Sequence, residues 1–79
     1  MKTIHIEYFA ILREQADRAS ESLVTDAETA EALFQELQSA HGFAAPSNFK
    51  VAINDEFSVW AAELHDGDRV VFIPPVAGG

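Results

Sequence analysis

Regular alternation of apolar and polar residues predicts a β-strand near the start of the chain. From Thr3 to Phe9, the side chains of Ile4, Ile6 and Tyr8 alternate with polar ones, which is the two-residue period of a strand with one buried face. Phe9 breaks the pattern because it falls on the polar side of this strand. We therefore expect Phe9 on the face opposite Ile4, Ile6 and Tyr8.

A spacing of three to four residues between apolar side chains predicts one main helix, from Ala30 to His41. Thr29 precedes this segment and is a good N-cap, since its hydroxyl can accept a hydrogen bond from a free backbone N–H of the first turn. Gly42 follows the segment and fits a left-handed C-cap. The apolar positions at this spacing are Ala30, Leu33, Phe34, Leu37 and Ala40 or His41.

Short strands separated by turns account for most of the remaining sequence. Turn signals occur at residues 54–56 and at Asp66-Gly67-Asp68, where glycine supplies a backbone geometry closed to other residues. The other predicted elements are a turn or short helical piece over residues 10–19 and strands at Ser20–Val24, Phe49–Ile53, Phe57–Trp60 and Arg69–Ile73. This order indicates an α+β fold in which one helix covers one face of a mixed sheet. Periodicity alone leaves the order of the strands open.

Length and composition narrow the classes of function. The 79 residues are expected to form a single domain, and 13 acidic against 5 basic residues give a net charge of −8. This charge disfavours nucleic acid and anionic membranes as partners. It suits a partner with a basic docking surface, or it simply keeps a small protein in solution.

The residue types present exclude several kinds of site. The chain has no cysteine, which rules out disulfides, thiolate catalysis and cysteine-rich zinc sites. Its three histidines show no metal-ligand spacing, so we expect no metal site. No signal-peptide pattern or apolar run of ~20 residues is present, and we therefore expect a cytoplasmic protein.

The last six residues, Pro74-Pro75-Val76-Ala77-Gly78-Gly79, are expected to form a flexible, projecting tail. Pro74 and Pro75 end the preceding strand because neither has a backbone N–H to donate, and both stiffen the base of the tail. Gly78 and Gly79 lack a Cβ, which lets this end enter a narrow channel of another protein. The alternative is a frayed terminus without function.

The segment from Leu64 to Gly79 resembles the end of the small subunit of molybdopterin synthase, a ubiquitin-like sulfur carrier. Its last eight residues, Phe72-Ile73-Pro74-Pro75-Val76-Ala77-Gly78-Gly79, are similar to an ending particular to the molybdopterin branch of these carriers. The other similar segments are Tyr8–Glu14, Thr29–Leu33 and Val51–Asn54, whereas residues 17–26 and 41–48 match least. The resemblance implies a ubiquitin-like β-grasp fold, which the order of the predicted elements fits.

The resemblance also implies a function for the C-terminal carboxylate. In that family the terminal glycine, here Gly79, is adenylated by a ubiquitin-activating-like adenylyltransferase that uses ATP, and a sulfur donor enzyme then converts it to a thiocarboxylate. The tail, residues 74–79, enters the active site of the large synthase subunit. There it donates sulfur to a cyclic pyranopterin phosphate, and two deliveries build the molybdopterin dithiolene. The chain would then be a non-catalytic sulfur-donor subunit without a bound cofactor, in a heterotetramer of two small and two large subunits.

The chemistry of the chain agrees with this interpretation. A C-terminal carboxylate has a pKa of ~3.3–3.7 and is ionised at neutral pH, which makes it a poor electrophile until it is activated. The chain has no phosphate-binding glycine loop, so ATP handling belongs to a partner. Since there is no cysteine, a sulfur carrier of this sequence has no thiol of its own to use.

Three apolar residues outside the predicted core, Phe9, Phe57 and Ile73, form a candidate partner interface. Paired as in a β-grasp sheet, all three lie on the face away from the helix. Family members have apolar residues at the matching places, which dock on the activating enzyme and the large subunit. Exposed aromatic clusters often mark interfaces, although the same residues could instead cover a secondary core.

Three other functions remain open at this point. A sulfur carrier of this kind could serve a different pathway, such as the one to thiamin thiazole. A ubiquitin-like modifier would use Gly79 to form isopeptide bonds with lysines of target proteins. A scaffold with an inert tail would be unaffected by loss of Gly79.

Overall fold

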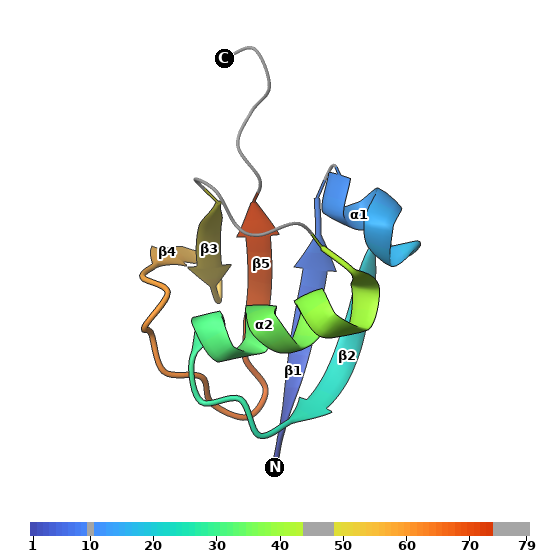
Figure 1. Cartoon of the computed structure of the whole chain (residues 1–79). Coiled ribbons are helices and arrows are strands. Elements are labelled where there is room, and N and C mark those ends of the chain that lie inside the picture. The colour runs from blue at the N-terminus through green and yellow to red at the C-terminus, as the bar shows by residue number, and fades with distance from the viewer. Residues whose placement is uncertain (10, 44–48, 74–79) are drawn as a thin grey trace.

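The computed structural model describes residues 1–9, 11–43 and 49–73, and it contains one five-stranded sheet (Figure 1). The strands are β1 (Lys2–Tyr8), β2 (Ser20–Thr25), β3 (Lys50–Ile53), β4 (Glu56–Ser58) and β5 (Arg69–Ile73). Their order in the sheet is β2-β1-β5-β3-β4. The long helix α2 (Ala30–His41) crosses one face of this sheet, and the short helix α1 (Ile11–Ala16) links β1 to β2.

Strand β5 occupies the middle of the sheet although it is the last strand along the chain. It pairs in parallel with β1, with Tyr8 opposite Phe72, and antiparallel with β3, with Val51 opposite Phe72. The hairpins β1–β2 and β3–β4 flank it and are antiparallel. The predicted mixed sheet with one main helix on one face is therefore confirmed.

Both ends of α2 lie at the predicted residues. The Thr29 hydroxyl accepts a hydrogen bond from the backbone N–H of Ala32 at 3.2 Å, which satisfies one of the free donors of the first turn. At the other end, Gly42 adopts the left-handed conformation with φ of 74° and donates its N–H to the carbonyl oxygen of Gln38 at 2.8 Å.

The core lies between α2 and the sheet, and Phe34 stands at its centre. Its ring packs against those of Phe72, Trp60 and Phe43, with centroid separations of 5.0, 5.6 and 5.9 Å. The core residues of the sheet and α2 are Ile4, Ile6, Tyr8, Ala30, Leu33, Phe34, Leu37, Val51, Val70 and Phe72. These are the positions at which the period of each element placed its apolar face, so burial follows directly from the sequence pattern.

One polar group in this core lacks a partner among the described residues. The Tyr8 hydroxyl is fully buried and makes no hydrogen bond within the described part of the chain. Burial, together with the nearby Glu21 carboxylate, raises the pKa of Tyr8 above its ordinary value. Glu21 itself pairs with Arg18 at 3.3 Å and with His41 at 3.2 Å, so this carboxylate ties β2 to the end of α2.

Buried Asp68 joins the turn before β5 to the hairpin between β3 and β4. Its carboxylate accepts hydrogen bonds from the backbone N–H of His65 at 2.8 Å and from the side-chain amide of Asn54 at 2.9 Å. The Asn54 side-chain oxygen in turn accepts from the backbone N–H of Arg69 at 3.0 Å. This network fixes where β5 begins.

The prediction of a strand from Phe57 to Trp60 was wrong at both ends. Asn54 and Asp55 have φ of 53° and 70° and form a two-residue hairpin turn. Pairing therefore resumes at Glu56, opposite Ile53, and β4 ends at Ser58. Trp60 leaves the sheet and stacks on Phe72 with a centroid separation of 5.8 Å.

Candidate partner-docking surface

The face of the sheet opposite α2 carries the three residues predicted to form a partner interface. Phe57 lies opposite Ala52 and is 75 % exposed. Ile73 lies opposite Lys50 and is half-buried. Phe9 directly follows buried Tyr8, the partner of Phe72, so it lies level with Ile73; it is 41 % exposed.

The cross-strand pairing places Phe57 and Ile73 on the predicted face, and Phe9 follows the last residue of β1. The cross-strand neighbours Ala52 and Val71 lie between Phe57 and β1 on the same face, so the apolar surface runs across three strands. Phe9 and Phe57 are substantially exposed rather than packed into a second core. That these residues contact a partner stays a prediction.

Two further residues of this surface escaped the sequence analysis. Val59 is 69 % exposed and, with Lys50, Phe57 and Ser58, lines a shallow hollow of about 490 Å³ beside β4. Val59 stands two residues after Phe57, a spacing that signals a shared face in a strand. The predicted strand from Phe57 to Trp60 contained both residues, so this signal was present in the sequence and was overlooked. We name Phe9, Phe57, Val59 and Ile73 the apolar patch, and Lys50 lies beside it.

The other half of the same face is polar and internally paired. The Arg69 guanidinium lies 3.1 Å from the Asp55 carboxylate and 3.9 Å from that of Glu7. His5 Nδ1 lies 2.9 Å from the Ser22 hydroxyl. The helix-free face thus divides into a paired polar half near the start of β5 and an apolar half near its end.

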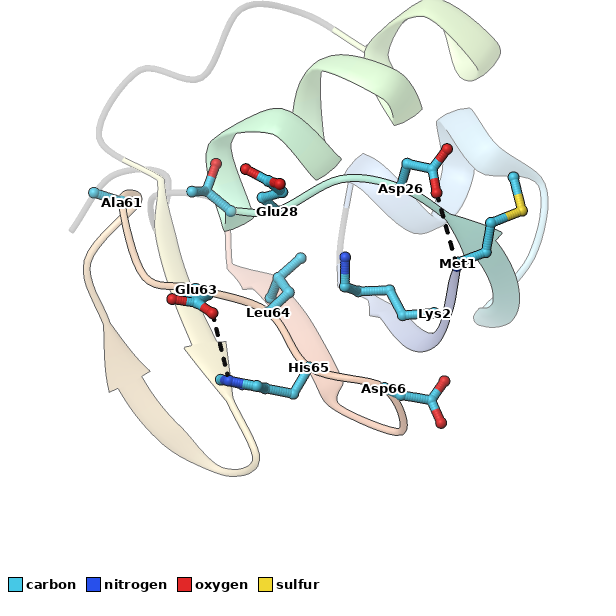
Figure 2. A pocket seen from close by; sticks show the side chains of 10 residues that line it. Met1, Lys2, Asp26, Glu28, Ala61, Glu63, Leu64, His65 and Asp66 are labelled. Carbon is cyan, nitrogen blue, oxygen red and sulfur yellow. Dashed lines mark ion pairs between the residues drawn. The ribbon is translucent and has the colours of Figure 1, made fainter.

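A second hollow, of about 830 Å³, lies at the opposite end of the sheet from the end of β5 (Figure 2). The N-terminal ammonium of Met1 lies 3.9 Å from Asp26 there, and Lys2 Nζ donates to the carbonyl oxygen of Ala27 at 3.0 Å. Its carboxylates are those of Asp26, Glu28, Glu63 and Asp66. All four residues are exposed to solvent, so this hollow is a solvated acidic end of the domain.

The described ranges, 1–9, 11–43 and 49–73, lack both a cluster of metal-binding side chains and a membrane-spanning helix. Within these ranges, no group of three or more His, Cys, Asp or Glu residues could hold a metal ion. No helix there is long and apolar enough to cross a membrane.

The residues predicted to carry the chemistry, Gly79 with Gly78, Ala77, Val76, Pro75 and Pro74, lie outside the described residues. The structure does describe the strand that leads to them. Strand β5 ends at Ile73, at the border of the apolar patch. Any docking on the patch therefore brings a partner to the residue directly before Pro74.

Comparison with protein families gives one match, to the ThiS family, over residues 6–79. The chain belongs to the ThiS family. The match covers nearly the whole chain and includes both the apolar patch and the final Gly78-Gly79. Comparison with curated protein sequences gave no significant match.

Solved structures similar to this ThiS-family chain have the same fold. A putative molybdopterin converting factor subunit 1 from Pyrococcus furiosus is 25% identical, with a TM-score of 0.80 over 96% of this chain and 100% of that chain. Small archaeal modifier protein 1 from H. volcanii is 21% identical, with a TM-score of 0.82 over 96% of this chain and 100% of that chain.

A third similar structure is a complex of subunits 1 and 2 of molybdopterin-converting factor from Helicobacter pylori. It matches at 21% identity and a TM-score of 0.64, over 98% of this chain and 99% of that chain. Together these matches confirm the predicted β-grasp fold of ubiquitin-like sulfur carriers.

Proposed function

We propose that this ThiS-family protein is the sulfur-carrier subunit of a molybdopterin synthase. The observation that carries the proposal is the family match, which extends through Gly79 and so includes the terminal Gly-Gly. The similarity to a putative molybdopterin converting factor subunit 1 supports this pathway. So does the ending from Phe72 to Gly79, which resembles that branch.

The proposed reaction begins at the Gly79 carboxylate. ATP bound by an adenylyltransferase converts the carboxylate to an acyl-adenylate and releases pyrophosphate. A sulfur donor enzyme supplies sulfur at the oxidation level of sulfide, which attacks the acyl-adenylate and displaces AMP, leaving a thiocarboxylate. The thiocarboxylate sulfur bonds to a carbon of a cyclic pyranopterin phosphate in the large subunit, and water then cleaves the bond between that sulfur and the Gly79 carbonyl carbon. This leaves the sulfur on the pterin and regenerates the carboxylate, and two such transfers complete the dithiolene of molybdopterin.

The described part of the chain would position this end rather than react. Strand β5 is held on both sides, by β1 and β3, so Ile73 is a rigid starting point for the six residues that follow. The apolar patch beside Ile73 offers a surface on which a partner can dock. The role of the domain is thus to deliver Gly79 to active sites on other proteins.

The proposed partners are the adenylyltransferase, the sulfur donor enzyme and the large synthase subunit. The Helicobacter pylori structure is a complex of two subunits of molybdopterin-converting factor, and we propose an equivalent pairing here, in a heterotetramer of two small and two large subunits. The net charge of −8 favours basic surfaces on these partners.

Intact-mass spectrometry tests the proposal directly. The protein is incubated with the matching adenylyltransferase, ATP and a sulfur donor, and the expected result is a mass increase equal to replacing one oxygen by one sulfur. A variant lacking Gly79 should fold normally by circular dichroism and show no such increase. A truncated protein that still transfers sulfur to a pyranopterin phosphate in the presence of the large subunit would refute the mechanism.

Two other functions of the C-terminal Gly79 can be distinguished from the proposed one by the protein that receives the sulfur or the glycine. A carrier for the thiamin thiazole pathway would supply sulfur to that pathway's enzyme and not to the molybdopterin synthase large subunit. A ubiquitin-like modifier would form isopeptide bonds, which appear as lysine adducts carrying Gly79 in peptide mass spectrometry of cell extracts. Sulfur delivery only to the large subunit, without lysine adducts, is the outcome that the proposal requires.

A further inference from the structure

We propose that Lys50 determines specificity in docking: its ammonium pairs with a carboxylate that the large synthase subunit presents opposite the apolar patch. This inference rests on the proposed function, since it names the charge that the docking partner must carry. It begins from the position of Lys50, an exposed residue at the start of β3 that pairs with Ile73 across the sheet. Lys50 also shares the hollow of Phe57 and Val59.

The charge of Lys50 is uncompensated within the described part of the chain. All 13 Asp and Glu side chains belong to described residues, and none forms an ion pair with Lys50 within 4.0 Å. On the same face, Arg69 is paired with both Asp55 and Glu7. Arg69 thus has two carboxylate partners, whereas Lys50, beside the exposed aromatic ring of Phe57, has none among the described residues.

Docking over the patch desolvates the Lys50 ammonium, which costs free energy of binding unless the partner supplies an opposite charge. A surface that covers Phe57 and Val59 also removes water from the hollow that Lys50 lines. A desolvated ammonium needs hydrogen-bond acceptors and an opposite charge, and a carboxylate supplies both through charge-assisted hydrogen bonds.

The positive charge of Lys50 allows the docking surface to distinguish between partners. The net charge of −8 attracts partners with basic surfaces, but a basic residue opposite Lys50 would be repelled. The correct partner must therefore combine a basic surface with one acidic residue at the position opposite Lys50. A requirement of this kind excludes wrong partners and fixes the orientation of docking.

The experiment compares variants with equal net charge in binding to the purified large subunit. Lys50→Gln removes the ammonium, whereas Gln35→Glu makes the same change in net charge at an exposed site on α2, on the other face of the sheet. Lys50→Arg keeps the positive charge, and Phe57→Ala tests the apolar patch itself. Calorimetry or surface plasmon resonance gives Kd at low and high salt, and circular dichroism checks each fold.

We expect Lys50→Gln to raise Kd about tenfold, Lys50→Arg to stay within about threefold of the original protein, and Gln35→Glu to have little effect. The difference between Lys50→Gln and the original protein should shrink at high salt, where charges are screened. Equal Kd values for Lys50→Gln and Gln35→Glu would overturn the inference. So would a Lys50→Gln variant that binds the large subunit normally but is adenylated poorly.

The outcome for Phe57→Ala separates this inference from the proposed function. Binding that Phe57→Ala weakens and Lys50→Gln does not would disprove the role of Lys50 and leave docking on the patch intact. Large-subunit binding that neither substitution alters would refute docking on this face. Absence of any binding by the original protein would refute the proposed function.

Discussion

Replacing Phe57 by alanine should separate docking from folding. The side chain is 75 % exposed on β4, so its removal deletes little buried surface from the domain. Surface substitutions of this kind usually change the free energy of unfolding by less than ~0.5 kcal/mol. We therefore expect a folded variant whose defect lies in partner binding.

The size of the binding defect follows from the exposed area. An aromatic side chain can bury roughly 150–250 Å², and three quarters of Phe57 is still available to a partner. At ~25 cal/mol per Å², covering that remainder contributes about 3–5 kcal/mol as an upper limit. Ordering the side chain costs about 0.5–1.5 kcal/mol, which leaves a loss of about 1.5–4.5 kcal/mol, or roughly 10–2,000-fold in Kd.

Binding to the large subunit measures this effect, with urea unfolding as the check on stability. Val24→Ala is the matched control, because Val24 is an apolar residue 59 % exposed on β2, opposite Thr3 and away from the patch. This control should bind normally. A Phe57→Ala variant that binds as tightly as Val24→Ala would refute the assignment of Phe57 to the interface, and a large loss of stability would show that the residue supports the fold instead.

Three further predictions concern stability. Gly42→Ala should lower the free energy of unfolding by about 1 kcal/mol in urea titrations, because φ of 74° strains any L-residue while a Cβ there meets no atom within 4 Å; an unchanged midpoint would contradict this. Asp68→Ala should cost about 1–3 kcal/mol, since it leaves the donors of His65 and Asn54 unpaired, whereas the exposed control Glu56→Ala should cost little. Tyr8→Phe should keep or slightly raise stability at neutral pH, because the buried hydroxyl has no partner among the described residues.

The raised pKa of Tyr8 gives that last substitution a pH dependence with a definite sign. Above pH ~10 a tyrosine in the unfolded chain loses its proton, while buried Tyr8 keeps it in the folded chain. The folded state then binds more protons, so stability falls as the pH rises. The original protein should lose stability above pH ~10 more steeply than Tyr8→Phe. Because Tyr8 is the only tyrosine, absorbance titration of the phenolate reports its pKa directly, and an ordinary value would contradict the prediction.

The sequence predicted best those elements whose ends carry their own signals. Helix α2 has a capping hydroxyl at Thr29 and a left-handed glycine at Gly42, and its predicted bounds are those observed. Strand β5 is preceded by a turn at Gly67 and ends at Ile73, also as predicted. The start of strand β4 was misplaced because the predicted turn at residues 54–56 is one residue too long: Asn54 and Asp55 alone adopt positive φ, and Glu56 already pairs in the sheet.

Part of the candidate site was likewise predicted from the sequence, and part of it was missed. Phe9 and Ile73 were found because each falls opposite the apolar face of its predicted strand. Phe57 was found from its place after a turn and from the family resemblance. Lys50 was missed because one lysine on a strand is unremarkable until its cross-strand neighbours are known. Those neighbours depend on pairing between segments far apart in the sequence, such as Lys50 with Ile73, and local periodicity carries no information about such pairing.

The central position of β5 makes assembly of the docking surface all-or-none. Before this strand is added, the hairpins β1–β2 and β3–β4 have no strand between them, and the patch residues Phe9 and Phe57 belong to separate halves. Joining them requires contacts between distant segments, the slow step in folding sheets of this kind. A chain in which β5 is not yet paired therefore cannot display the complete patch. Partners that dock on the patch would therefore bind only molecules in which β5 is already paired with β1 and β3. Copies in which this strand is misfolded would not be bound.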